Sequence, residues 1–160
     1  MMLLMTIIKE LILGGGYLDE VSVSYVRIAE CYTYLNENEK IVYYFMEAIN
    51  FDPTNIEAYG KLAIYYNNKK KYNLSYILLK TALSKIPKEI PNKLFLYKDY
   101  YIKYNKIYYE LSVVCYYIKL YKQGLSICNF LEQDVGSNLY INYNLPKIKK
   151  FYTDKLNIIN

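Results

Sequence analysis

Histidine and tryptophan are both absent from this sequence of 160 residues. Without histidine, neither a Ser–His or Cys–His catalytic pair nor a histidine-ligated metal site can form. Cysteine occurs three times, at Cys31, Cys115 and Cys128, without a C-x-x-C motif, which excludes a zinc ribbon and a disulfide scaffold. Arginine occurs once, at Arg27, although Lys and Arg together number 20. Arginine is the usual residue for reading phosphates and base edges, so nucleic acid is not an expected partner.

The remaining composition is that of a folded chain. Hydrophobic residues make up 54% and charged residues 22%, with a net charge of +5. This length corresponds to one domain or one short repeat array. The sequence is rich in Lys, Asn, Ile and Tyr, with 23 tyrosines. These amino acids have AT-rich codons, so the tyrosines partly report an AT-rich genome and carry less functional weight.

The apolar start of the chain, MMLLMTIIKELIL, does not resemble a signal peptide. It has no basic n-region, Lys9 and Glu10 interrupt it, and Gly14–Gly16 follow in place of a cleavage site. Thirteen residues are also too few to span a bilayer. We therefore expect a helix that packs on protein and a cytoplasmic location without a membrane partner. The three cysteines fall in expected helices, where they should be reduced and buried.

A repeat of 34 residues runs through the first half of the chain. The set Tyr25, Ile28, Ala29 and Tyr32 returns 34 residues later as Tyr59, Leu62, Ala63 and Tyr66. Such spacing marks one face of a helix, so each unit is predicted to be two antiparallel helices and a turn. A third copy, with Tyr108, Leu111, Ser112 and Cys115, follows at a shift of 49 from the second. The 15 extra residues (49 − 34) indicate an insertion after Pro87.

Small residues recur where the paired helices should cross closely. A large side chain at these places would push the helices beyond the usual distance of about 8–10 Å. The positions are Ala29, Ala63 and Ser112 on the first helices, and Ser75 and Gly124 on the second. At the boundary between the first two units, Thr54 and Glu57 have the spacing of a capping box.

These helix pairs, with fixed aromatic and leucine positions, small residues at the crossing and a terminal proline, resemble the tetratricopeptide repeat. The resemblance implies an all-α solenoid of antiparallel helix pairs that binds proteins. The predicted divisions are 1–21 (an orphan helix and glycine turn), 22–55, 56–87 and 105–135 (three repeat units), 88–104 (the insertion) and 136–160 (a capping helix). Pro146 is expected near the first turn of that cap.

A narrower resemblance is to the helical repeat tail behind the catalytic domain of family 2 glycosyltransferases. It rests on residues 14–32, 53–66 and 90–131, including the run Glu110-Leu111-Ser112-Val113 and the later Gly124 and Cys128. The chain departs from that pattern at Tyr17, where Trp is expected. The aspartates never form the D-x-D element that holds metal and sugar nucleotide in such enzymes, and Cys128 has no histidine base. No catalytic residue, cofactor or metal ligand is therefore expected.

Three functions remain open. The first is a non-catalytic interaction scaffold, an accessory or remnant segment of a glycosyltransferase system, with a glycosyltransferase catalytic domain as a possible partner. The second is the C-terminal tail of a longer glycosyltransferase whose catalytic domain lies outside this chain. The third is a weak binder of nucleic acid or membrane driven by lysines such as Lys69–Lys71. The uncovered face of the orphan helix could also mediate self-association.

The first helices of tetratricopeptide units line a concave groove, and this resemblance supplies the candidate binding residues. They are Val26, Glu30 and Tyr34 in the first unit, Ile64, Asn67 and Asn68 in the second, and Tyr109, Val113 and Tyr116 in the third, with Thr33, Gly60 and Tyr117 at further positions of the same helices. Chaperone adaptors of this class hold a C-terminal carboxylate with Lys and Asn in the groove. Val26 and Glu30 stand in those places here, and Glu30 would repel a carboxylate, so such a clamp is not expected.

Overall fold

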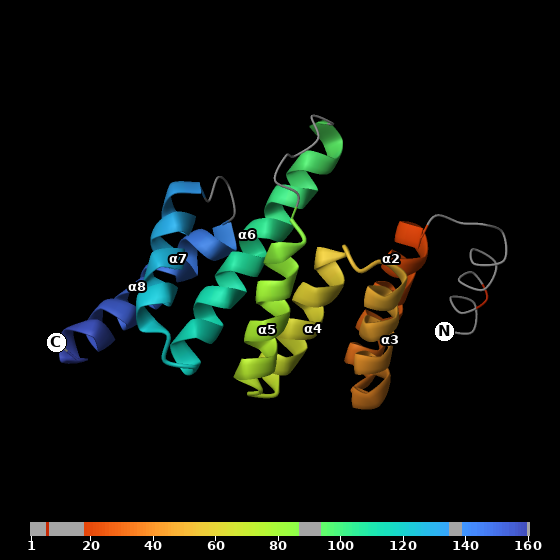
Figure 1. The fold of residues 1–160 in the computed structure, drawn as a ribbon, viewed down its shortest axis with the longest axis horizontal. Helices are drawn as coiled ribbons and strands as arrows, with labels where there is room; N and C mark the ends of the chain where they lie inside the picture. Colours follow the sequence, from red (N-terminus) through yellow and green to blue (C-terminus); the bar gives the residue numbers. More distant parts are fainter. Residues whose placement is uncertain (1–5, 7–17, 87–93, 135–138, 160) are drawn as a thin grey trace.

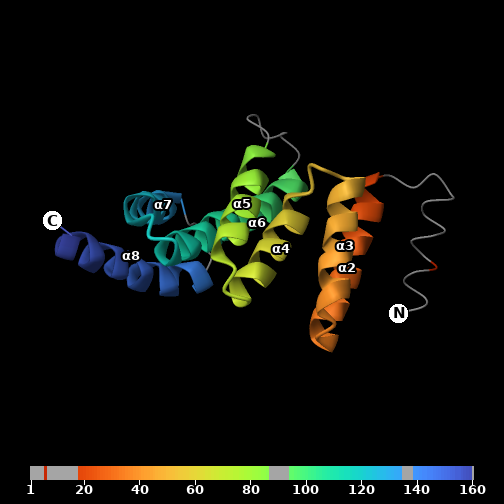
Figure 2. The same ribbon diagram turned by 60° about the horizontal axis from the view of Figure 1, so that its bottom comes forward.

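The computed structural model of this chain describes residue 6 and residues 18–86, 94–134 and 139–159. Within these ranges the regular structure is helical and no strand occurs. The helices are α2 (Leu18–Leu35), α3 (Asn38–Phe51), α4 (Ile56–Asn68), α5 (Tyr72–Ser84), α6 (Leu94–Tyr117), α7 (Tyr121–Asp134) and α8 (Leu139–Ile159). Antiparallel pairs stand side by side in chain order, with α2 and α8 at opposite ends (Figures 1 and 2). The predicted all-α solenoid of helix pairs is confirmed.

The turns inside the three pairs share one backbone geometry. Asn36, Lys70 and Lys119 have φ angles of 58°, 58° and 64° and so lie in the left-handed region. The next amide donates to a carbonyl five residues back each time, from Glu37 to Tyr32 at 3.2 Å and by the matching bonds at 2.9 Å in the other two turns. This is the Schellman end of a helix. The left-handed residues are 34 and 49 positions apart, so the backbone repeats at the shifts found in the sequence.

The link between α3 and α4 is capped one residue later than predicted. The N-cap of α4 is Asn55, whose side chain accepts a hydrogen bond from the amide of Ala58 at 3.1 Å. Thr54 instead donates its hydroxyl to the carboxylate of Asp52 at 2.6 Å. The capping box predicted for Thr54 and Glu57 is therefore wrong, because the short Asp52 side chain takes the threonine hydroxyl for the turn.

Asn55 also joins the first two helix pairs. Its side-chain amide donates to Ser22 Oγ at 2.7 Å, and Ser22 Oγ donates in turn to the carbonyl of Ala48 at 2.7 Å. Ser22 is fully buried on α2. One hydroxyl thus connects α2, the end of α3 and the start of α4, and this fixes how the second pair sits on the first.

Small residues lie at the crossings, but Gly124 serves a different neighbour from the one expected. Ala29, Ala63 and Ser112 are completely buried. A Cβ at Gly124 would lie 2.1 Å from Cζ of Tyr152, which belongs to α8. The lack of a side chain at Gly124 therefore allows the capping helix α8 to pack closely on α7. The sequence pattern had predicted that Gly124 allows close contact between α7 and its pair partner α6.

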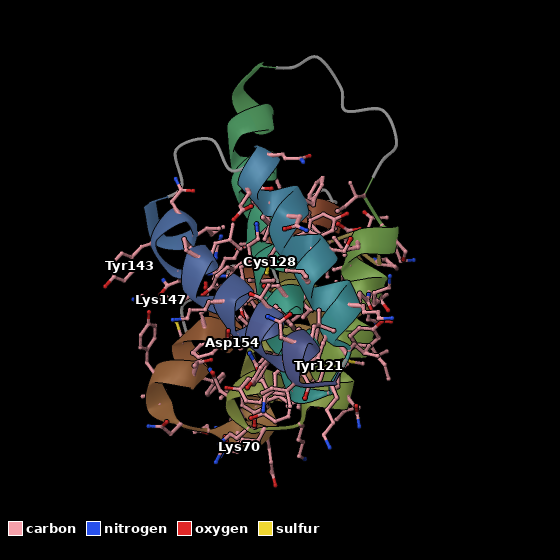
Figure 3. All side chains as sticks on the ribbon, turned by 90° about the vertical axis from the view of Figure 1, so that its left-hand side faces the viewer. Lys70, Tyr121, Cys128, Tyr143, Lys147 and Asp154 are labelled. Carbon is pink, nitrogen blue, oxygen red and sulfur yellow. The ribbon has the colours of Figure 1, made fainter. Side chains whose placement is uncertain are left out.

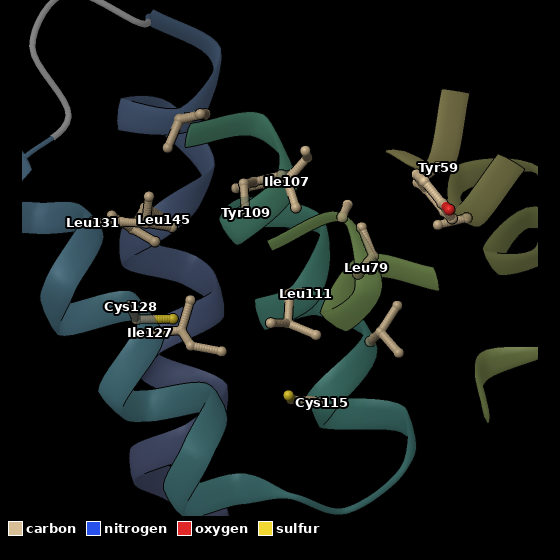
Figure 4. Close-up of a cluster of buried hydrophobic side chains, with 14 of the residues drawn as sticks. Tyr59, Leu79, Ile107, Tyr109, Leu111, Cys115, Ile127, Cys128, Leu131 and Leu145 are labelled. Atoms are coloured by element: carbon tan, nitrogen blue, oxygen red, sulfur yellow. The ribbon is translucent and has the colours of Figure 1, made fainter. Parts of the chain in front are cut away.

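The buried side chains form two clusters that meet at α4. One joins α2 and α3 and receives Ala58 and Leu62 from α4. The other runs from α4 to α8 and receives Ile56, Tyr59 and Ala63 from α4. Figure 4 shows the second cluster, with Leu111 and Cys115 of α6 facing Ile127 and Cys128 of α7. Because α4 contributes to both clusters, the repeat array has one continuous core.

The segments outside the three pairs differ from the predictions in two places. The predicted insertion, 88–104, is helical from Leu94 onward as the first part of α6, which rises above its neighbours in Figure 1. Pro146 was predicted to lie near the first turn of the capping helix. It lies further inside α8, because this helix begins at Leu139. The buried Ile141 and Leu145, which precede the proline, explain the earlier start, because their packing extends the helix across it. The predicted orphan helix at residues 1–13 lies outside the described residues, except for Thr6.

The cysteines do not share one environment, contrary to the prediction. Cys115 and Cys128 are buried, whereas Cys31 is exposed on α2. Burial raises the pKa of both buried thiols to about 11. These two sulfurs are held in the protonated form at neutral pH, which fits a packing role and excludes an activated nucleophile.

Candidate partner-binding groove

The first helices of the three pairs, α2, α4 and α6, border two adjoining depressions. The larger, of about 270 Å³, is lined by residues of α2, α3, α4 and α6, including Glu30, Tyr34 and Asn68. The other, of about 230 Å³, has an apolar floor made by Ile56, Gly60, Ile64, Leu79 and Ile107. Lys61, Ile64 and Lys106 line both. The two depressions thus form one groove across the helix pairs, and we call it the α2–α4–α6 groove.

A network of four charged side chains bridges α2 and α4 at the groove. Arg27 lies 2.7 Å from Glu30 and 3.0 Å from Glu57, measured between Nη1 and the carboxylate oxygens. Lys61 pairs with Glu30 and lies 3.4 Å from Glu57. Burial alone would raise the pKa of Glu30, but the hydrogen bonds from Lys61 and Arg27 outweigh it and lower that pKa. Two cations and two carboxylates balance here, so this part of the rim has no net charge.

The third pair contributes a half-buried carboxyl group. Glu110 on α6 receives a hydrogen bond from the side chain of Asn67 on α4 and lies near Lys106. Burial raises the pKa of Glu110, while the Lys106 charge and the Asn67 hydrogen bond oppose that rise. Lys106 is exposed. The groove therefore combines an apolar floor with hydrogen-bonding and charged groups at its edges, as binding clefts commonly do.

Comparison with known proteins supports this architecture. The sequence profile of the tetratricopeptide repeat matches residues 44–84. The N-terminal domain of stress-induced protein-1 (STI-1) from C. elegans has a similar structure, with a TM-score of 0.64, 13% identity, and coverage of 84% of this chain and 98% of that one. The chain is a tetratricopeptide-repeat-like α-solenoid. Among curated proteins, no sequence matches it at a significant level.

Four of the predicted groove residues line the depressions of this solenoid. They are Glu30, Tyr34, Ile64 and Asn68, and Tyr34 is 86% exposed. The further candidates Thr33 and Gly60 line them as well. Asn67 stands beside them through its hydrogen bond to Glu110. The sequence pattern thus places part of the groove on the observed face of α2 and α4.

The remaining predicted residues belong to the core or to its margin. Val26 is completely buried and Tyr109 is 6% exposed, so neither offers a surface to a partner. Val113 and Tyr116 pack against the second hydrophobic cluster, and the Tyr116 ring contacts that of Tyr152 with centroids 5.9 Å apart. These positions turn inward because one residue along a helix rotates the side chain by about 100°.

The prediction missed five charged groove residues, three of which directly follow a candidate position on a first helix. Arg27, Lys61 and Glu110 are equivalent under the repeat shifts of 34 and 49, and so are Glu57 and Lys106. All but Arg27 line a depression, and Arg27 joins its charged rim. The recurrence of charged residues at equivalent first-helix positions was the available signal, because charges rarely recur on a buried face.

In the described ranges, no three Cys, Asp or Glu side chains gather as ligands for a metal ion. No helix in the same part of the chain is long and apolar enough to cross a membrane.

Proposed function

We propose that the chain is a non-catalytic interaction scaffold that binds an extended segment of a partner protein in the α2–α4–α6 groove. Tetratricopeptide repeats are typical of protein–protein interaction. The observation that carries the proposal is the continuity of the two depressions through Lys61, Ile64 and Lys106. Because they share these residues, a single extended chain can occupy both.

The lining indicates the chemistry of the bound segment. The floor formed by Ile56, Ile64 and Ile107 suits an apolar side chain, and burial of apolar area supplies most of the free energy of such contacts. The charged rim is close to neutral, so it contributes to binding through hydrogen bonds more than through net charge. Glu30 is already paired with Lys61 and Arg27. The segment is therefore expected to be apolar and internal, with no requirement for a free C-terminal carboxylate.

Selection of peptides from a displayed random library, followed by fluorescence anisotropy, tests this proposal. Ile64→Glu places a charge on the apolar floor and should weaken the selected peptides at least about tenfold. Ile77→Glu is the matched control, because Ile77 lies on α5 and is 59% exposed outside the groove. Amidated peptides should bind as well as those with a free carboxylate. Equal losses in both variants, or a library that yields no peptide sensitive to Ile64→Glu, would overturn the proposal.

The more specific partner, a glycosyltransferase catalytic domain, is a proposal that rests on the sequence resemblance alone. Co-expression with such a domain and measurement of complex formation by the Ile64→Glu and Ile77→Glu variants tests it directly. The alternative that the chain is the tail of a longer glycosyltransferase predicts that an antibody to residues 18–86 detects a larger native product. Self-association through the N-terminal residues predicts a concentration-dependent dimer that disappears when residues 1–13 are removed.

A further inference from the structure

The turns of the second and third helix pairs lie together at one end of the molecule. A depression of about 530 Å³ is lined on one side by Lys70–Leu74 and on the other by Tyr117, Ile118 and Lys119. The rings of Tyr72 and Tyr117 stack with centroids 4.2 Å apart and planes 3° from parallel. Figure 3 shows Lys70, which lies in the turn of the second pair, and Tyr121, which directly follows the turn of the third pair, at the same end. The two turns are thus held at a fixed separation.

This surface is basic and lacks carboxylates in its own segments. Lys70, Lys71 and Lys119 line the depression, and Lys69 and Lys122 lie near them in the chain; all five lysines are exposed. No Asp or Glu occurs from 58 to 86 or from 111 to 131. Within the described residues, none of the five lysines forms an ion pair. The nearest turn along the array differs, because Glu37 there pairs with Lys40 at 2.5 Å. We call the five lysines and their apolar neighbours Leu74, Tyr117 and Leu120 the basic edge.

The three apolar neighbours are exposed as well. The exposed fraction is 45% for Leu74, 51% for Tyr117 and 39% for Leu120. Lysines around a few exposed leucines and a tyrosine form the pattern of a surface that rests on a bilayer, with the charges at the headgroups and the apolar groups just below. A solvent-exposed surface of lysines alone would have no apolar side chains to enter the bilayer.

We propose that the basic edge docks on an anionic phospholipid surface. The charge complements such a membrane, and each lysine near it contributes about a fivefold increase in binding. RNA fits less well, since single-stranded RNA stacks its bases on open aromatic faces. Tyr72 and Tyr117 stack on each other and so cover one face apiece. The edge is formed by the second and third turns, whereas the α2–α4–α6 groove lies along the first helices, so this inference is independent of the proposed function.

Co-sedimentation of the full chain with vesicles tests the proposal. The vesicles are of phosphatidylcholine alone or with about 30% phosphatidylserine. The test variant is Lys70→Gln/Lys71→Gln/Lys119→Gln. The control, Lys80→Gln/Lys85→Gln/Lys150→Gln, removes the same charge from exposed lysines elsewhere. A second test variant, Leu74→Ser/Leu120→Ser, leaves the charge unchanged. Circular dichroism verifies that each variant is folded.

The expected result is binding to the anionic vesicles only, reduced about a hundredfold in the test triple by the loss of three lysines. The control triple should lose no more than about fivefold, and higher salt should weaken binding of the wild type. The leucine variant should also bind less tightly. Absence of binding to anionic vesicles, or equal losses in the two triples, would overturn the proposal. So would tighter binding of a U-rich single-stranded RNA than of the vesicles.

Discussion

Replacement of Gly124 by alanine should undermine the contact between α7 and α8. The new Cβ would lie 2.1 Å from Cζ, 2.2 Å from the hydroxyl oxygen and 2.4 Å from Cε1 of Tyr152. Carbon atoms in contact are normally about 3.5–4.0 Å apart, so the ring or the helix must move by more than an ångström. The ring is completely buried and donates its hydroxyl to the carbonyl of Ser112. Any displacement therefore also strains a buried hydrogen bond.

The magnitude follows from three contributions. Overpacking of a dense core costs about 1–3 kcal/mol, and a weakened buried hydrogen bond adds about 1 kcal/mol. The higher helix propensity of alanine returns about 0.5–1 kcal/mol. Gly124→Ala should thus lower the free energy of unfolding by about 2–3 kcal/mol. Urea unfolding followed by far-ultraviolet circular dichroism measures this as a fall in the midpoint of about 1 M or more.

A second background isolates the steric cause. Tyr152→Leu removes all three of the atoms that the new Cβ would meet, so Gly124→Ala should then cost nothing or stabilise by up to about 1 kcal/mol. The coupling energy of the double-mutant cycle should be about 2 kcal/mol or more. Gly60→Ala is the matched control, because its Cβ would lie 3.4 Å from Ile107, an ordinary contact. The same cost of Gly124→Ala in both backgrounds would refute the reasoning.

Three further predictions concern buried hydroxyls, a turn and the thiols. Ser75→Ala should stabilise the protein by about 1 kcal/mol, because Ser75 Oγ is buried without a hydrogen-bond partner in the described ranges. Ser22→Ala removes two hydrogen bonds and should destabilise it by about 1–2 kcal/mol. Urea unfolding of the two variants measures both changes. Lys119→Gly should raise the melting temperature, since glycine adopts φ of 64° without the roughly 1 kcal/mol cost of a side chain. The two buried thiols have a folded pKa of about 11, above the ordinary 9.0, so their stabilisation is complete below pH 9 and falls as the pH rises through 11. A thiol reagent at neutral pH should modify only Cys31 rapidly, and fast reaction of all three would contradict the burial.

The helix pairs and their turns could be predicted because they depend on local sequence. Apolar spacing along one face predicts a helix, and the shifts of 34 and 49 recur as the left-handed residues Asn36, Lys70 and Lys119. The cap of α4 was predicted one residue too early. Asn55 and Thr54 both have capping side chains. The nearby Asp52 takes the hydroxyl of Thr54, and Ser22, which is 33 residues away and reaches Asn55 only in the folded chain, accepts from the Asn55 amide.

The groove was predicted only in part, for a geometric reason. Ile64 and Asn68 lie in it, whereas Val26, assigned to the same face, is fully buried. On a helix that packs against neighbouring helices on two sides, one residue can face the groove while the next residue along the chain faces the core. The neighbouring helices set this rotation, and their positions are not readable from the spacing within one helix.

The sequence by itself determined that this chain is an array of antiparallel helix pairs, since periodicity and small crossing residues act over a few turns of one or two helices. The tertiary structure alone decided which side chains face a partner and which reach the core. It brought Arg27 of α2 to Glu57 of α4 and Lys61 of α4 to Glu30 of α2. It also set Tyr152 against Gly124 and stacked Tyr72 on Tyr117. Each of these contacts joins residues of different helices, and close packing of whole helices selects among the many pairings that the local pattern permits.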